Sequence, residues 1–174
     1  LTKNLWLHRG GEKVAHRQAL VHGINDVHPP RVSPYTRLMS FPRVNGLRGI
    51  EFGAPGKSRA YLTALVLNGN KRATAGLLSE YEDEGEDIEH IGEELAMLDS
   101  NDTHVGTLRV TRAEVMRFGD VPDEFALAEA EGDLNAEDFR NSHLDYWGRM
   151  GQEVDDDTMV VTVYFDLVSR GPGA

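Results

Sequence analysis

The segment at residues 71–76 contains side chains whose types and spacing could do chemistry. Lys71 and Thr74 are three residues apart, so a helical or tight-turn conformation would place the ammonium and the hydroxyl on one side. Gly76 follows and lets the backbone approach whatever lies opposite. A lysine beside a hydroxyl can bind an oxyanion, or can activate the hydroxyl where burial lowers the lysine pKa. A Lys-x-x-Thr spacing also occurs by chance, and the alternative interpretation is a solvated helix entry.

Three other groups of side chains could bind anions or metals. Arg109, Arg112 and Arg117 could border an anionic ligand, or could balance nearby acids on the surface. The acidic run at residues 80–89 could hold a cation, but carboxylates clustered without regular spacing favour a solvated, self-repelling loop. The histidines within residues 1–38 are separated by eight, six and six residues, which matches no tight ligand pattern: His8, His16, His22 and His28. The sequence therefore assigns no metal site and no cofactor.

Hydrophobic periodicity predicts about three helices that would position these groups. The first covers residues 59–67, with Ser58 as its N-cap and Asn68-Gly69 at its end. The second opens at Pro122 and ends near Gly132, and spacing alone makes Glu129 an exposed carboxylate on it.

The third predicted helix covers residues 135–150. Residues at three- and four-residue spacing form one face, which is most simply a core-packing face: Phe139, His143, Tyr146, Trp147 and Met150. A histidine on such a face is more typical of a partly buried, hydrogen-bonded residue than of a catalyst. Trp147 could also stack on a nucleobase, although core packing is favoured.

Alternating patterns predict strands at residues 94–98, 103–111, 115–118 and 159–167. Leu108 and Val110 should face one side of their strand, and Arg109 and Thr111 the other. The glycine-rich lead-in at residues 44–58 lacks a dinucleotide-binding spacing, and its Ile50 and Phe52 should pack on the core. Strands and helices mixed in this order predict an α+β domain.

Charge and composition limit the function. The 174 residues carry a net charge of −11, which counts against wide, non-specific binding of nucleic acid. Residues 1–38 carry +4 and residues 39–174 carry −15. The chain has no cysteine, which excludes disulfides and thiolate zinc sites and favours a cytoplasmic location. No apolar run approaches the roughly 20 residues that span a bilayer, so no membrane partner is expected.

The composition divides the chain into three parts. Residues 1–38 are basic and interrupted by prolines, and we expect a disordered extension that folding does not require. Met39 would make an ordinary start just before the main domain, and an alternative interpretation is that the extension is not part of the natural protein. Residues 39–170 should form one domain, and residues 171–174 a frayed tail.

Four segments, taken in order, resemble the ASCH domain family (activating-signal-cointegrator homology) in its stand-alone bacterial branch. They are NGNKRATAGLLSEYEDEG, THVGTLRVTRAEVMRF, PDEFALAEAEGD and TMVVTVYFDLVSR. The resemblance covers about residues 42–170. It implies a small, partly open β-barrel of the PUA-like type found in RNA-modification proteins, with about three helices.

The resemblance also implies a site. In the family, the helix that opens at Pro122 faces the Lys-x-x-Thr segment across a pocket. Related bacterial enzymes that deacetylate N4-acetylcytidine carry a glutamate at the position matching Glu129, so the expected catalytic residues are Lys71, Thr74 and Glu129. Ligand contacts are expected from Arg72, Gly76, Arg109 and His143. This chain departs from those smaller enzymes by its acidic connector and by the longer helical stretch after Gly132.

The leading functional expectation is a protein that binds a nucleobase-type ligand and hydrolyses the amide of an N-acylated cytosine nucleoside. One alternative is a non-catalytic RNA-binding module, and another is a metal-independent ribonuclease. The expected partner is a nucleoside or a short single-stranded RNA, with no DNA. The sequence leaves open whether the protein is an enzyme, and what its oligomeric state is.

Overall fold

A computed structural model describes residues 42–173, so the predictions for residues 1–38 lie outside the described residues. Within this range, six strands form one sheet in the order β1-β2-β4-β5-β6-β3. The strands are β1 (Arg43–Val44), β2 (Leu47–Ile50), β3 (Ala73–Leu77), β4 (Glu94–Leu98), β5 (His104–Arg117) and β6 (Met159–Arg170). The helices are α1 (Lys57–Leu67), α2 (Leu78–Glu84), α3 (Asp123–Glu129) and α4 (Ala136–Arg149), with a 3₁₀ turn, η1 (Phe118–Asp120).

The α+β class is confirmed. The sheet is mixed, because β2 and β4 run parallel while the other neighbouring strands run antiparallel. It stays open, since β1 and β3 are the two ends of the strand order. The described residues contain four α-helices, where the sequence predicted about three.

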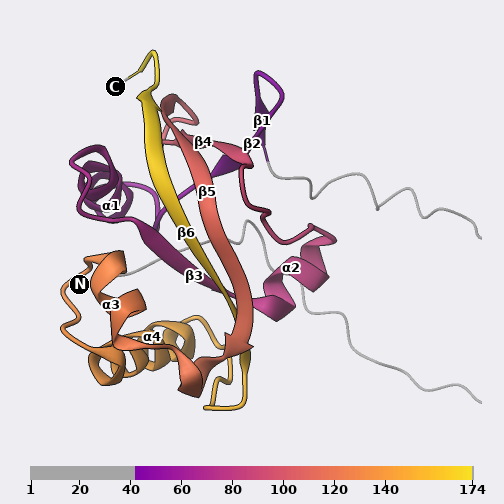
Figure 1. Ribbon diagram of the computed structural model, residues 1–174, viewed down its shortest axis with the longest axis vertical. Helices are drawn as coiled ribbons and strands as arrows, with labels where there is room; N and C mark the ends of the chain where they lie inside the picture. The colour runs from indigo at the N-terminus through magenta and orange to yellow at the C-terminus, as the bar shows by residue number, and fades with distance from the viewer. Residues whose placement is uncertain (1–41, 174) are drawn as a thin grey trace, which may run out of the picture.

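Long strands β5 and β6 run side by side through the molecule (Figure 1). Two core clusters pack on the sheet that they form. On one face, α1 packs on a core cluster that includes Phe52 and Phe165, whose ring centroids lie 5.6 Å apart. On the other, α3 and α4 lie together beside β3 over a second cluster. This second cluster is aromatic, with edge-on contacts such as Phe118 against Trp147 at 5.5 Å. Ile50 and Phe52 are buried, as the sequence predicted.

Strands and helices with strong periodicity follow their predictions closely. Strand β4 has the predicted bounds, and Leu108 and Val110 are buried on the face opposite to Arg109 and Thr111. Helix α4 begins after Asn135, whose side chain accepts the amide proton of Asp138. In α1, however, the N-cap is Gly56 and the predicted cap at Ser58 is wrong.

The prediction of a helical or tight-turn Lys-x-x-Thr segment is wrong for Thr74. Residues 73–77 are extended and pair with β6, with Thr74 opposite Val163 and Gly76 opposite Val161. Local preference for Ala-Thr-Ala-Gly is weak, and the long apolar strand β6 supplies the pairing that decides the conformation. Lys71 lies two residues before β3, and its backbone amide donates to Leu65 in α1.

The acidic run at residues 80–89 is not the predicted solvated loop. Residues 78–84 form α2, where the Glu80 carboxylate accepts the amide proton of Leu77 at the helix start. Burial raises the pKa of Glu80 to about 7 against the opposing effect of that hydrogen bond. Glu89 is also buried, accepts the phenol proton of Tyr81 and lies 3.9 Å from Arg48. Burial raises the pKa of both Glu89 and Tyr81.

Candidate functional site

Lys71 is buried between two glutamates and an aromatic ring. The residue is 1% exposed. Its Nζ donates to Glu131 Oε1 at 2.7 Å and lies 3.8 Å from Glu129 Oε1. On another side, Nζ lies 5.6 Å from the centroid of the Phe52 ring, within the range of a cation–π contact. Two carboxylates and a ring face therefore surround the side-chain nitrogen of Lys71.

Glu129 reaches the site because α3 ends against the outer edge of β3. The amide of Arg72 donates to the Ala128 carbonyl at 2.8 Å, and the amide of Ala75 donates to Glu129 Oε1 at 3.1 Å. Since β3 is the last strand of the sheet, these are bonds that a further strand would otherwise make. Ala130 then turns with a φ of 53°, a conformation uncommon outside glycine, and the chain continues to Glu131. Glu129 thus holds the strand edge and faces Lys71 with the same oxygen.

Thr74 is buried on β3 at 3% exposure. Directly opposed residues in an antiparallel pair place their side chains on one face, so Thr74 shares the face of Val163. Val163 belongs to the core cluster that contains Phe52, the ring beneath Lys71. The Thr74 hydroxyl has no hydrogen-bond partner among the described residues. A buried hydroxyl without a partner is costly, and such groups concentrate where a structure serves a ligand.

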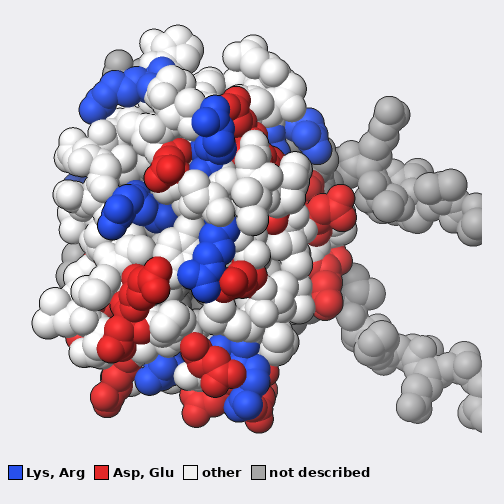
Figure 2. Space-filling model, in the orientation of Figure 1, with Lys and Arg blue, Asp and Glu red and all other residues white. Residues whose placement is uncertain are grey.

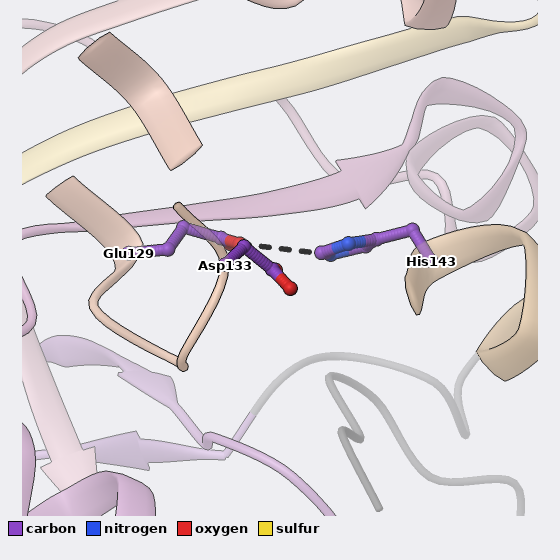
Figure 3. A group of neighbouring side chains, drawn as sticks. All are labelled: Glu129, Asp133 and His143. Atoms are coloured by element: carbon purple, nitrogen blue, oxygen red, sulfur yellow. Dashed lines mark ion pairs between the residues drawn. The ribbon is translucent and has the colours of Figure 1, made fainter. Parts of the chain in front are cut away.

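His143 projects from α4 toward the end of α3. Its Nδ1 lies 2.9 Å from the Phe139 carbonyl oxygen, which can only accept, so Nδ1 carries the proton. Nε2 is thereby directed at Glu129 Oε2, 3.7 Å away. Figure 3 shows these two side chains pointing toward one another, with Asp133 beside them. One potential ligand atom from each of the three residues lies within 4.8 Å of the others.

The remaining predicted ligand residues are dispersed. Arg72 is exposed and lines a groove, whereas Gly76 is buried in β3. Arg109 pairs with Glu94 at 2.7 Å across the β4–β5 ladder, and it does not line the groove. The structure therefore brings together Lys71, Thr74, Glu129 and His143 around one end of β3, with Arg72 next to them.

An open groove of about 600 Å³ lies between α3 and strands β5 and β6. Its lining combines one cation, two carboxylates, two hydroxyls and apolar surface: Arg72, Thr111, Glu124, Leu127, Ala128, Tyr164, Phe165 and Asp166. Lys71 and Glu129 are chain neighbours of Arg72 and Ala128, the two residues whose backbone bond joins β3 to α3. The groove and the buried cluster are therefore neighbours at the place where α3 meets β3.

Comparison with known families decides the identity. The family model described as "ASCH domain" matches residues 49–169. The chain belongs to the ASCH domain family. Among solved structures, an ASCH domain from Lactobacillus crispatus JV V101 is 23% identical with a TM-score of 0.61, covering 69% of this chain and 78% of that one. A protein from Enterococcus faecalis V583 is 24% identical with a TM-score of 0.59, covering 67% and 72%. None of the curated proteins matches the chain.

Two acidic residues of this ASCH domain site were missed by the sequence reasoning. Glu131 makes the shortest contact to Lys71, and Asp133 lies beside His143. The signal was present, because Glu129, Glu131 and Asp133 alternate after the end of α3. The sequence pattern at these positions predicts only the end of a helix. The contact between Lys71 and Glu131 joins residues 60 positions apart, which local periodicity does not report.

The outer surface of the ASCH domain carries both signs of charge. Figure 2 shows basic and acidic side chains interspersed over one face of the described residues. Arg109, Arg112 and Arg117 each pair with a nearby carboxylate, and Arg140 donates to the carbonyl of Gly119. Of the helices in the described range, none is long and apolar enough to cross a bilayer.

Proposed function

We propose that this ASCH domain binds a nucleobase-type small ligand at the Lys71 cluster and hydrolyses an amide on an acylated cytosine amine. The observation that carries the proposal is the buried combination of a cation, carboxylates and an unpartnered hydroxyl: Lys71, Glu129, Glu131 and Thr74. Such a set offers both donors and acceptors away from water, which the edge of a nucleobase requires. Family membership supports the choice of ligand class.

The geometry favours a reaction in which water is the nucleophile. Lys71 Nζ is positioned by its contact with Glu131, and as a donor it is suited to stabilise the oxygen of the amide carbonyl as negative charge develops there. The Thr74 hydroxyl supplies a second donor to that oxygen. Glu129 accepts a proton from the attacking water, and the same proton passes to the nitrogen as the carbon–nitrogen bond breaks. The products are a carboxylic acid and the free cytosine amine.

A second route uses Thr74 as the nucleophile and a neutral Lys71 as its base. This route requires Lys71 to give up its proton while Glu131 Oε1 is 2.7 Å from Nζ. The ion pair opposes that loss, which is why we rank the water route first.

Access to the cluster involves the groove. Lys71 and Glu129 are each 1% exposed, so a ligand that reaches them must displace part of the surrounding chain. The end of α3 is held to β3 by two hydrogen bonds, from the Arg72 amide to the Ala128 carbonyl and from the Ala75 amide to the Glu129 carboxylate. The segment that follows it leads into the loop before α4. We infer that the acylated amine enters beside this segment, while the rest of the nucleoside occupies the groove lined by Arg72 and Tyr164. A groove of this volume is within the usual range for small-molecule sites.

The test is incubation of the purified protein with N4-acetylcytidine and, separately, with a short single-stranded RNA, without added metal. Glu129→Gln keeps an oxygen that can accept from Ala75 but removes the carboxylate base, and should lower the deacetylation rate by roughly 10²–10⁴-fold. Glu137→Gln, on the exposed side of α4, is the matched control and should leave the rate unchanged. Deacetylation that survives Glu129→Gln would show that we have named the wrong site.

An RNA-binding module is the second candidate. It would use Arg109, Arg112, Arg117 and Arg140 as phosphate contacts, but each of these side chains already has a partner within the domain. This pairing, together with the strongly acidic chain, makes the module the weaker proposal. Cleavage of the RNA with no deacetylation would instead favour the metal-independent ribonuclease.

A further inference from the structure

We propose that Glu129, Asp133 and His143 form a binding site for a divalent transition-metal ion of the zinc class. The three side chains come from the end of α3, from the following loop and from α4, and they converge on one point (Figure 3). Glu129 and His143 are buried, and Asp133 is half-buried, so this is an internal set rather than a group of surface acids. The spacing of the three positions matches no familiar ligand pattern, so the set emerges only from the folded structure.

The separations are close to those that a metal requires. Two ligands at about 2.1 Å from a tetrahedral ion lie roughly 3.4 Å from one another. His143 Nε2 and Glu129 Oε2 are 3.7 Å apart, and the ligand atoms of all three residues lie within 4.8 Å. Shifts of a few tenths of an ångström for the first pair, and a rotation of the half-buried Asp133 carboxylate, would bring them to binding distance. Three protein ligands leave a further position for water or substrate.

Each ligand residue is oriented by a hydrogen bond with a group outside the set. His143 Nδ1 donates to the Phe139 carbonyl, which directs the Nε2 lone pair inward. Glu129 Oε1 accepts from the Ala75 amide, which leaves Oε2 toward His143. The Ser142 hydroxyl donates to Asp133 Oδ2 at 3.0 Å. Partners of this kind fix the orientation of metal ligands and tune their basicity, and none of these three partners belongs to the ligand set.

The local charge also fits a dication. Glu129 and Asp133 bring two carboxylates to the position, and His143 brings an imidazole. Carboxylate charge stabilises a divalent cation in a buried site. Because one ligand is an imidazole, a zinc-class ion is favoured over magnesium or calcium, which prefer oxygen ligands.

The site is tested by titrating the full-length protein, first stripped with EDTA, with Zn²⁺ in a calorimeter. We expect one site that Asp133→Asn weakens by at least about tenfold, since the amide cannot replace the carboxylate charge. Ser142→Ala touches no metal position and should weaken binding by about 10–100-fold through the orientation of Asp133. His143→Gln should abolish the site, and a thermal melt establishes that each variant is folded, because His143 packs against Phe139 and Trp147.

Two controls separate this site from other histidines and acids. His90→Ala removes an exposed histidine, and Asp145→Asn removes an exposed carboxylate of α4, and both should bind Zn²⁺ like the parent. Binding that is unchanged by Asp133→Asn and His143→Gln would overturn the proposal and point to other groups, such as the histidines within residues 1–38. No binding by the parent protein would overturn it as well. The titration uses no nucleoside, so its result is independent of whether the proposed hydrolysis occurs.

Discussion

The buried hydroxyl of Thr74 allows stability and function to be separated by one substitution. Thr74→Val replaces the hydroxyl by a methyl group of the same shape. A buried polar group without a hydrogen bond costs about 1–3 kcal/mol, so removing it should stabilise the folded protein by about 1 kcal/mol or more. For a chain of 174 residues, 1 kcal/mol corresponds to a rise in melting temperature of roughly 2–4 °C.

The domain supplies a matched control. Thr63 in α1 is 7% exposed, compared with 3% for Thr74, and its hydroxyl likewise has no partner among the described residues. Thr63→Val should therefore stabilise the fold by a similar amount. The two variants differ in the proposed chemistry, because only Thr74 lies on the face of β3 shared with the Phe52 cluster.

The assay measures both quantities on both variants. Thermal unfolding gives the change in stability, and release of acetate from N4-acetylcytidine gives kcat/KM. Loss of a donor to a developing oxyanion lowers the rate by about 10²–10³-fold, so Thr74→Val should be more stable and much slower. Thr63→Val should be more stable and equally active. A fall in melting temperature of several degrees in Thr74→Val would mean that the hydroxyl has a structural partner, and would refute the stability argument. Full activity in a stable Thr74→Val variant would remove Thr74 from the proposed mechanism.

Three further predictions address the surroundings of the site. Because burial raises the pKa of Glu80 to about 7, folding favours its protonated form, and its contribution to stability is lost as pH rises from about 4.5 to 7. Relative to the parent, Glu80→Gln should therefore raise the free energy of unfolding at pH 8 by about 1–2 kcal/mol more than it does at pH 5, after allowance for partial exposure. Urea unfolding at both pH values measures this difference, and a variant whose difference from the parent does not depend on pH would contradict it. Glu131→Gln removes the closest charge from Lys71 and should destabilise the fold by about 1.5–3 kcal/mol by the same method, whereas an unchanged unfolding midpoint would mean that the pair is dispensable. Nucleoside affinity, measured by calorimetry, should vary weakly between 50 and about 200 mM salt, while a steep loss of RNA affinity over the same range would favour the RNA-binding module.

The elements of the fold that the sequence predicted are those with a strong local pattern. Strand β6 alternates along its length, and α4 begins after an asparagine cap and keeps one apolar face. These patterns depend on neighbours in the chain, and they survive in the folded protein because the tertiary contacts agree with them. The order of the quoted motifs was enough to identify the family that the comparison established.

Strand β3 and helix α2 required information that local pattern does not contain. Ala73–Leu77 has little intrinsic preference for a strand, and its conformation comes from β6, more than 80 residues later. The start of α2 depends on Glu80 capping the amide of Leu77, while the acids around it suggested a solvated loop. In both places a long-range or capping interaction outweighs composition.

The candidate site shows the same limit. Lys71, Thr74, Glu129 and His143 were named from the motif and the family resemblance, and the structure places them around one end of β3. Glu131 and Asp133 were missed, because their importance arises only when the end of α3 folds against β3. Whether these residues act in catalysis stays a prediction for the assays described above.

The number of carboxylates at the end of β3 argues that the cluster does more than hold the fold together. Closing the strand edge needs only neutral acceptors, and the Ala128 carbonyl already serves Arg72 in that way. Neutralising Lys71 needs one carboxylate, and Glu131 provides it at 2.7 Å. Glu129 adds a second buried carboxylate, 3.8 Å from Lys71 Nζ, and apolar residues of similar volume are often as stabilising as a buried ion pair or more so. This second carboxylate is held to β3, the strand that carries the buried Thr74 hydroxyl, and it is the group that the proposed hydrolysis would use as its base.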